Sequence, residues 1–216
     1  MLLFSTINDV QLHFATPVLC RTWPDAARYH PSLKQLILEK RQGEAGASFS
    51  NRGGWQSRDD FFVWGGDGSR ALAQWAQSCV LHIHDTYYPE RFQQFLNSPD
   101  TQLQMRLVAW ANVNGKGDWN ATHNHPNCHW SGVHYVKVPP GSGQIALLDP
   151  RPAINMLDTG CETLDLFRQV PRTIEPKEGM TVIFPSWLQH QVTTHESEEE
   201  RISIAFNLRF IVGAAQ

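Results

Sequence analysis

The sequence predicts a mainly β domain with α-helices, an antiparallel jelly roll whose sheet is buttressed by N-terminal helices. From residue 101 onward, apolar and polar residues alternate in short stretches, and glycine and proline mark turns between them, as at 139–143. In the first hundred residues, apolar residues instead repeat at intervals of three and four, which is typical of amphipathic helices. We therefore expect one domain over 1–216, with a strand and helices in 1–100 and the jelly-roll core in 101–212.

The elements before the core follow from their local patterns. Residues 9–22 contain β-branched and aromatic side chains and predict one or two short strands. The pattern over 24–42 predicts a helix that Pro31 interrupts. A second helix is expected to begin at an N-cap, Ser69, and a third covers 89–96.

Three connecting segments carry more specific expectations. Segment 43–60 is rich in Gly, Ser and Asn and predicts a long loop, but Trp55 argues against disorder. We expect either a substrate lid or a surface Ω-loop there. Asp149 and Arg151 are expected to form a structural salt bridge or turn cap, and 196–200 a solvated hairpin turn.

The composition excludes several classes of protein. The net charge is -3 and charged residues make up 18% of the chain, so no basic surface indicates a nucleic acid or membrane partner. The N-terminal stretch lacks the basic start of a signal peptide, and no apolar run reaches membrane-spanning length. We expect a cytoplasmic protein with reduced thiols, because the four cysteines are scattered and form no CxxC pair. A homodimer is compatible with this composition, since jelly rolls often associate through edge strands or added helices.

Three histidines predict a metal centre. His123 and His125 are two residues apart at the entry to an alternating stretch, so one face of a strand can direct both imidazoles to the same point. His190 follows a strand-like run, 181–184, and a Pro-Ser turn. Three histidines from two strands are a plausible facial triad for a metal ion.

Five other histidines are left out of this ligand set. His82 and His84 are also two apart, but they fall on a helical stretch, where such residues diverge. His134 alternates out of phase with the strand face that would hold the site. The positions of His129 and His195 give no ligand prediction.

An arginine and a serine predict an anion-binding site near the histidines. Arg201 lies eleven residues after His190, at the start of the alternating stretch RISIAFNLRF. Ser203 shares its face of that strand. Pointing an arginine and a hydroxyl into a barrel is costly unless an anion binds them, and a carboxylate suits the guanidinium.

These motifs resemble a known family of enzymes. The histidine spacing is similar to that of cupin-type jelly rolls, with Gly117 six residues before His123. Histidine ligands followed by Arg-x-Ser are similar to the signature of Fe(II)- and 2-oxoglutarate-dependent oxygenases. The strings HNHP, SGVHYVKVP, LLDPR, FPSWLQH and RISIAFN together resemble a little-characterised family of bacterial and phage 2-oxoglutarate/Fe(II) oxygenases. The resemblance covers 110–210 and extends to 53–57.

The resemblance implies a fold, an activity and a set of site residues. The fold implied is a double-stranded β-helix, and the activity is that of a dioxygenase or hydroxylase with Fe(II) and the cosubstrate 2-oxoglutarate. The implied catalytic iron ligands are His123, His125 and His190. The implied contacts to 2-oxoglutarate are Arg201, Ser203, Tyr135 and, as a weaker candidate, Asn112.

The chain departs from the family pattern at one metal ligand. His125 stands where most such oxygenases have Asp or Glu. A neutral imidazole leaves bound Fe(II) one charge unit more positive, which favours an anionic keto acid and weakens oxygen activation.

Two alternative functions therefore stay open. One is a three-histidine cupin metalloenzyme that does not use 2-oxoglutarate, such as a thiol dioxygenase or an isomerase. The other is a non-catalytic jelly roll that binds a metal or a small acid. The sequence does not identify the substrate, which is either a small molecule or a side chain of a larger molecule.

Overall fold

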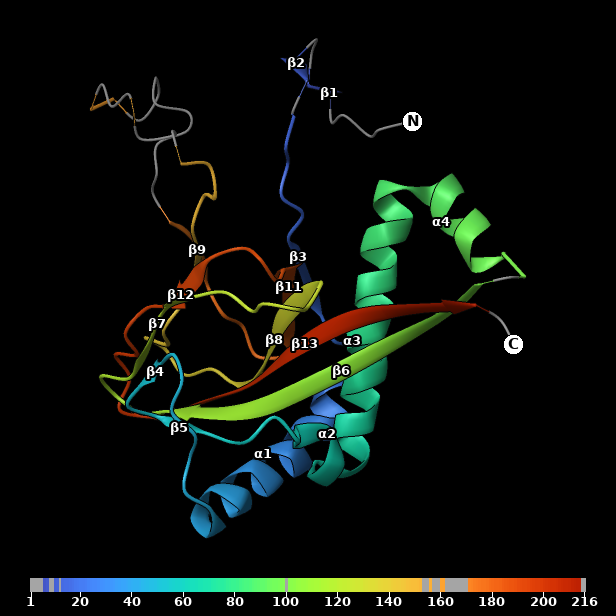
Figure 1. The fold of residues 1–216 in the computed structure, drawn as a ribbon. Coiled ribbons are helices and arrows are strands. Elements are labelled where there is room, and N and C mark those ends of the chain that lie inside the picture. Colours follow the sequence, from blue (N-terminus) through green and yellow to red (C-terminus); the bar gives the residue numbers. More distant parts are fainter. Residues whose placement is uncertain are drawn as a thin grey trace.

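The computed structural model describes residues 6–7, 10–11, 13–99, 101–152, 156, 160–161 and 171–214. Two antiparallel sheets face each other, and helices cover the outer side of the larger sheet (Figure 1). The predicted mainly β class with N-terminal helices is confirmed.

The strands are ordered so that distant segments of the chain become neighbours. The six-stranded sheet has the order β3-β11-β8-β13-β6-β5. Its strands are β3 (Leu19–Thr22), β5 (Trp55–Gln56), β6 (Thr101–Asn114), β8 (Trp130–Lys137), β11 (Met180–Pro185) and β13 (Arg201–Ala214). The five-stranded sheet has the order β10-β9-β12-β7-β4. Its strands are β4 (Asn51–Arg52), β7 (Trp119–His123), β9 (Ile145–Leu147), β10 (Arg172–Ile174) and β12 (His190–Val192). Two short strands, β1 (Thr6–Ile7) and β2 (Val10–Gln11), pair with each other.

The long strands β6 and β13 are antiparallel partners over their whole length, from Arg201 opposite Asn114 to Ala214 opposite Thr101. Alternate residues of β13 are apolar and buried on the side of the helices; they are Ile202, Ile204, Phe206 and Leu208. The residues between them face the opposite side, toward the smaller sheet. The period-two pattern of the sequence therefore separates a packing face from a functional face.

The helices bury their apolar faces against the packing face of the six-stranded sheet. They are α1 (Ala26–Gly43), α2 (Phe61–Trp64), α3 (Gly66–Tyr87) and α4 (Pro89–Leu96). Leu33 and Ile37 of α1 and Leu72 and Val80 of α3 are fully buried in the same core as the β13 residues. A second, smaller core lies between the two sheets; its buried residues are Tyr135, Ile145, Leu147, Met180, Val182, Phe184 and Leu188.

The segment 43–60, predicted as a loop, contains two strands that join the sheets. β4 pairs with β7 at the edge of the five-stranded sheet, and β5 pairs with β6 at the edge of the six-stranded sheet. Only Gly53 and Gly54 separate them. Gly53 has a φ of 69°, and a Cβ there would lie 1.9 Å from a carboxylate oxygen of Asp118, so the turn requires glycine. The segment therefore connects the edges of the two sheets, and we call it the seam.

Two helix predictions were wrong in detail. α3 begins at Gly66, so Ser69 is not its N-cap and instead donates a hydrogen bond from within the helix to the Gly66 carbonyl, at 2.9 Å. Pro31 does not interrupt α1, which runs through it. The proline lies near the start of the helix, where it removes a single backbone hydrogen bond, and the burial of Leu33 and Ile37 offsets that loss.

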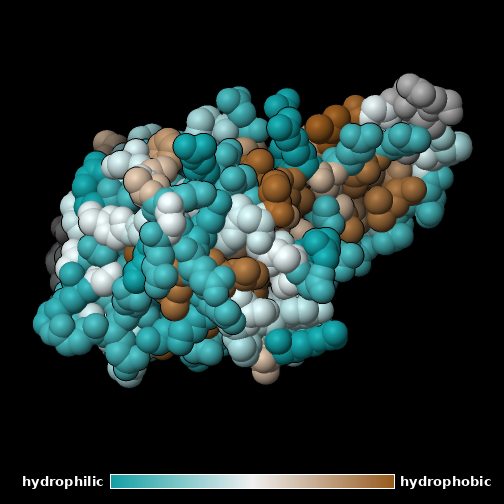
Figure 2. Space-filling model, turned by 90° about the horizontal axis from the view of Figure 1, so that it is seen from below, coloured by the Kyte–Doolittle hydropathy of each residue, from teal (hydrophilic) through white to brown (hydrophobic). Residues whose placement is uncertain are grey.

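The outer half of the β6–β13 pair projects beyond the rest of the sheet (Figure 1). There β6 and β13 pair only with each other: within the described residues, no third strand pairs with β13 beyond Leu208 or with β6 beyond Ala109. Figure 2 shows hydrophobic side chains gathered at this projecting end, at the upper right of the view. The exposed apolar residues of this region include Leu96, Ile211 and Val212.

Every helix in the described part of the chain is too short or too polar to cross a lipid bilayer.

Replacement of Phe206 by alanine tests the role of the packing face. Phe206 is fully buried between the helices and the sheet, so we expect its truncation to lower the free energy of unfolding by about 3–5 kcal/mol. Urea denaturation measures this change. Ile211→Ala, on the same strand but 41% exposed, should cost less than about 1 kcal/mol. Equal losses for the two variants would contradict the assignment of the core.

Candidate metal centre

A cavity of about 530 Å³ opens between the two sheets. Its walls come from the inner faces of both sheets and from the seam segment 47–59. All seven residues singled out from the sequence line it; they are His123, His125, His190, Arg201, Ser203, Tyr135 and Asn112.

The three histidines converge because of how β7 and β12 pair. His123 ends β7 and His190 begins β12, and the two are cross-strand partners. His125 follows two residues later, and its backbone N–H donates to the carbonyl of Ser186 at 2.9 Å. Each histidine offers a ring nitrogen, and these three nitrogens lie within 4.8 Å of one another. That arrangement can hold a single metal ion on one face.

Two backbone carbonyls fix the orientation of the imidazoles. The Nδ1 of His123 lies 2.7 Å from the carbonyl oxygen of Ala121, and the Nδ1 of His190 lies 2.9 Å from that of Leu188. A carbonyl accepts only, so Nδ1 carries the proton in both rings and Nε2 keeps its lone pair. This is how metal-binding histidines are commonly held.

Burial keeps the three imidazoles neutral. It lowers the pKa of His190 to about 3 and, together with the neighbouring His123, lowers the pKa of His125 to about 4. Desolvation also lowers the pKa of His123. Neutral imidazoles can bind a metal ion at physiological pH without first losing a proton.

The anion-binding candidates lie in a row across the six-stranded sheet. Ser203 is the cross-strand partner of both Asn112 on β6 and Tyr135 on β8. Arg201 lies two residues from Ser203 on the same face and is 3% exposed. Tyr135 is also buried, and its desolvation raises the pKa of its hydroxyl to about 12. The hydroxyl therefore keeps its proton and can donate a hydrogen bond.

The guanidinium of Arg201 is only partly satisfied by the protein. One Nη donates to the Gly143 carbonyl at 2.7 Å, and the other donates to Oδ1 of Asn114 at 2.9 Å. Its Nε is buried and has no hydrogen-bond partner among the described residues. No carboxylate forms a salt bridge with it in the described part of the chain. A buried cation with an unpaired donor is costly, and an anion in the cavity would offset that cost.

Sequence reasoning missed several residues of the cavity. Gln56 is the cross-strand partner of Asn112 and extends the row of polar groups to the seam. The hydroxyl of Ser50 lies 3.4 Å from Nε2 of His123. Trp110 lies on β6 with its ring 5.6 Å from that of His125. The signals for the seam residues were the polar composition of 43–60 and the family resemblance at 53–57, and neither predicted which strands they would pair with.

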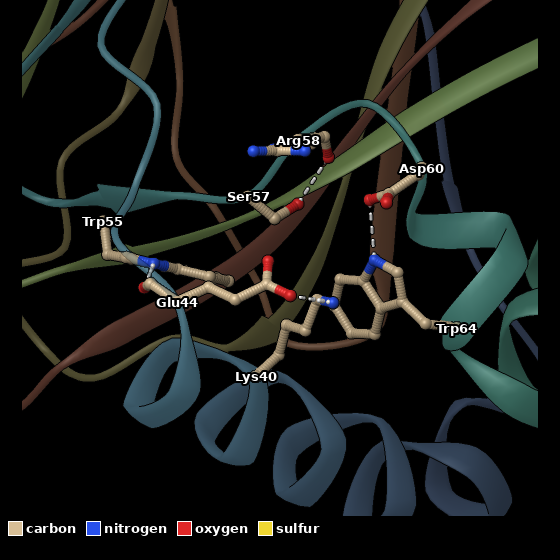
Figure 3. Close-up of polar contacts among 7 residues, drawn as sticks. All are labelled: Lys40, Glu44, Trp55, Ser57, Arg58, Asp60 and Trp64. Atoms are coloured by element: carbon tan, nitrogen blue, oxygen red, sulfur yellow. Dashed lines mark hydrogen bonds and ion pairs between the residues drawn. The ribbon is translucent and has the colours of Figure 1, made fainter.

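The seam is anchored to the helices, as Figure 3 shows. The indole N–H of Trp55 donates to the carbonyl of Glu44 at 3.1 Å, and that of Trp64 donates to Asp60 at 2.8 Å. The ammonium of Lys40 contacts Glu44 at 2.5 Å and lies 5.5 Å from the Trp64 ring centre. These contacts hold the wall of the cavity in place and argue against the substrate lid, one of the two alternatives expected for this segment.

The histidines excluded from the ligand set do not line the cavity; they are His82, His84, His129, His134 and His195. His134 faces the helices, where its Nε2 lies 2.9 Å from Nε2 of His30. Burial lowers the pKa of His134 to about 3. The predicted salt bridge between Asp149 and Arg151 is present, with a distance of 2.5 Å.

Removal of one imidazole should abolish the metal site. We expect His190→Ala to weaken Fe(II) binding more than about 100-fold, since loss of even an outer contact to a metal ligand costs 10–100-fold. Anaerobic isothermal titration calorimetry measures the affinity. The matched control is His82→Ala on the exposed side of α3, and equal affinity of both variants would refute the site.

The metal-free protein should lose stability in mild acid. The pKa values of His190, His125 and His134 are about 3, 4 and 3 in the folded protein, against about 6.5 in an unfolded chain. The unfolded state therefore binds more protons below pH ~6.5, and the stability present above that pH is lost as the pH falls. The loss is up to about 1.4 kcal/mol per pH unit for each histidine. Urea denaturation in EDTA at pH 7.5 and 5.0 measures it, and a constant free energy of unfolding would contradict the neutral, buried state.

The comparisons with known proteins agree with this geometry. Residues 108–207 match the model of a family described as "Putative 2OG-Fe(II) oxygenase". No match was found among curated protein sequences.

Three solved structures show the fold. A prolyl-4-hydroxylase from Pseudomonas putida has 15% sequence identity and a TM-score of 0.58, over 89% of this chain and 91% of that one. A prolyl hydroxylase from Trichoplax adhaerens, in complex with a hypoxia inducible factor peptide fragment, has 12% identity and a TM-score of 0.60, over 89% and 83%. HygX from Streptomyces hygroscopicus, with nickel and 2-oxoglutarate bound, has 10% identity and a TM-score of 0.53, over 90% and 83%.

These similarities confirm the predicted double-stranded β-helix. The segment that matches this family's model, 108–207, carries the three histidines, Arg201 and Ser203.

Proposed function

We propose that the protein is an Fe(II)- and 2-oxoglutarate-dependent oxygenase with a three-histidine metal site. One observation carries this proposal: Arg201 lines the same cavity as the histidines, and its buried Nε has no hydrogen-bond partner among the described residues. A metal site alone would not need this cation. A keto acid that binds both the metal and the arginine would explain why the histidines and Arg201 line the same cavity.

The donor set suits Fe(II). The imidazoles of His123, His125 and His190 are neutral, and their ring nitrogens converge on one point. Three protein ligands on one face would leave a metal ion accessible to a cosubstrate. Imidazole also binds Zn, Cu and Ni, so the ligand set by itself does not select iron.

The opposite end of the cavity suits a carboxylate. Arg201 supplies a positive charge and an Nε donor without a partner among the described residues. Ser203 supplies a hydroxyl, and its cross-strand partner Tyr135 supplies a protonated phenol. All three are buried, so hydrogen bonds to an anion here are stronger than in water. Asn112 and Gln56 continue the row and would position the rest of the keto acid.

Iron, when bound, would use dioxygen as the oxidant and 2-oxoglutarate as the cosubstrate, with succinate and carbon dioxide as coproducts. The residues of the chain would bind and orient the cosubstrate and the substrate, and they would exclude water from the cavity. Val133, Phe184 and Trp110 provide the apolar part of the cavity wall. No side chain is required as a general acid or base, which agrees with a cavity in which Asp59 is the one carboxylate among the described lining residues.

His125 favours a second candidate function. A three-histidine site is one charge unit more positive than a site with two histidines and a carboxylate. A cupin-type enzyme that oxidises a thiol, or isomerises its substrate, would use such a site without 2-oxoglutarate. In that case Arg201 would hold the carboxylate of the substrate itself, and oxygen consumption would not depend on 2-oxoglutarate.

We also propose that the protein acts in the cytoplasm, on a small molecule or on a side chain of a larger molecule. The absence of CxxC pairs from the sequence supports the first part. Two residues that line the cavity, Arg58 and Asp59, are exposed, so the cavity is open to solvent there and is compatible with either kind of substrate.

Replacement of Arg201 by lysine tests the anion site. Lysine keeps the charge but lacks Nε and the planar fork, so we expect 2-oxoglutarate to bind at least about tenfold more weakly, as loss of one charged hydrogen bond predicts. Fe(II) affinity should stay the same. Anaerobic calorimetry measures both affinities, and thermal melting checks that the variant folds.

Arg151→Lys is the matched control, because this arginine is 49% exposed and pairs with Asp149 outside the cavity. If Arg201→Lys binds 2-oxoglutarate as tightly as this control does, the arginine serves another anion.

A further inference from the structure

The functional face of the β6–β13 pair continues beyond the cavity. Cross-strand partners on this face are, from the cavity outward, Trp110 with Ala205, Val108 with Asn207, and Arg106 with Arg209. The pairing of β6 with β13 has no register shift, so all six share one side of the sheet. Trp110 and Ala205 line the cavity, and the two arginines lie four residues further out on their strands.

The row between the cavity and the arginines offers hydrogen-bond donors. Ser131 of β8 is the neighbour of Asn207 and lines the cavity. Its hydroxyl lies 2.7 Å from Oδ1 of Asn207. Because this contact occupies the carbonyl oxygen of the side chain, the amide N–H groups of Asn207 are available to another molecule.

Arg106 and Arg209 form an uncompensated pair of cations. Both are exposed, and as direct cross-strand partners their Cβ atoms lie about 5 Å apart. Like charges at such positions are destabilising. Neither arginine forms a salt bridge with an acidic residue in the described part of the chain. The nearby charges at the cavity mouth, Arg58 and Asp59, offset each other. The outer part of this face is therefore positive in a protein whose net charge is -3.

We propose that the substrate is an acidic stretch of polypeptide, which lies along this face with its carboxylates on Arg106 and Arg209 and one side chain in the cavity. This inference rests on the proposed oxygenase function, because it names the substrate class of the same site.

The distances favour a polypeptide. The ring of Trp110 is 5.6 Å from that of His125, and Arg106 is four residues, or about 13 Å, from Trp110 along the strand. A free amino acid does not span this length. An extended peptide has nearly the same rise per residue as the strand beneath it, so an acidic residue about four positions from the modified one would meet the arginines. Nucleic acid requires a broader basic surface than a chain with a net charge of -3 provides.

The test is a binding measurement with three labelled probes. Fluorescein-labelled hexaglutamate, hexalysine and a six-nucleotide oligothymidylate are titrated with the full-length protein at low salt, and fluorescence anisotropy reports binding. We expect hexaglutamate to bind and hexalysine not to bind. The double variant Arg106→Gln, Arg209→Gln should weaken hexaglutamate binding at least about tenfold, because two charge-assisted contacts are lost. Both residues are exposed, and thermal melting confirms folding.

A second double variant, Arg28→Gln with Arg70→Gln, removes the same charge from α1 and α3, on the opposite side of the sheet. It should change hexaglutamate affinity by less than about twofold. The inference is overturned if hexaglutamate does not bind, or if the two double variants weaken its binding equally. It is also overturned if oligothymidylate binds as tightly as hexaglutamate and depends on the same arginines.

Failure of this inference can be separated from failure of the proposed function. The affinity of the wild-type protein for 2-oxoglutarate is measured in the same preparation. If hexaglutamate binding depends on Arg106 and Arg209 but 2-oxoglutarate does not bind, the peptide surface stands and the oxygenase function fails. If 2-oxoglutarate binds and hexaglutamate does not, the oxygenase function stands and the peptide surface fails.

Discussion

The pairing of β6 with β13 over fourteen residues is the constraint on which the rest of the structure depends. Because a strand alternates its side chains, this pair presents Ile204 and Phe206 to the helices and Ser203 to the cavity. If the register shifted by one residue, the side chain of Arg201 would point into the apolar core and that of Ile202 would point into the anion site. The same register therefore fixes the core and the site. The register also explains why Arg106 and Arg209, on the outer half of the β6–β13 pair, lie on the same face of the sheet as the cavity.

The candidate site lowers the stability of the fold before any ligand binds. Three imidazoles are held neutral, which costs stability below pH ~6.5. The guanidinium of Arg201 is buried, and its Nε has no hydrogen-bond partner among the described residues. The helices offset this cost by burying a continuous apolar face against the sheet. A ligand that binds only the folded state adds stability by mass action. Metal and keto acid would thus complete interactions that the protein leaves open.

The sequence predicted the parts of the site that lie on long, regular strands. Arg201 and Ser203 could be assigned to one face because their strand alternates, whereas Tyr135 was assigned to the site from the family resemblance. His123 and His190 could be recognised from their spacing, although that they are cross-strand partners became clear only from the structure.

The seam was beyond sequence reasoning for a physical reason. β4 and β5 are two residues long, too short for any periodicity, and each forms only because an edge strand of a sheet is already present. Their pairing brings Gln56 beside Asn112 and encloses the cavity. The start of α3 was misplaced for a similar reason. Gly66 allows α2 to lead almost directly into α3, and no local capping signal marks that junction.

The central claim is that the three histidines and Arg201 form one site, in which a metal ion and a keto acid bind together. The most direct test is an anaerobic titration of the Fe(II)-loaded protein with 2-oxoglutarate, followed by visible absorption. The account predicts a weak charge-transfer band, because the keto acid chelates iron only if both occupy the same cavity. Tight binding of iron without such a band would contradict the account and favour the three-histidine enzyme that does not use 2-oxoglutarate.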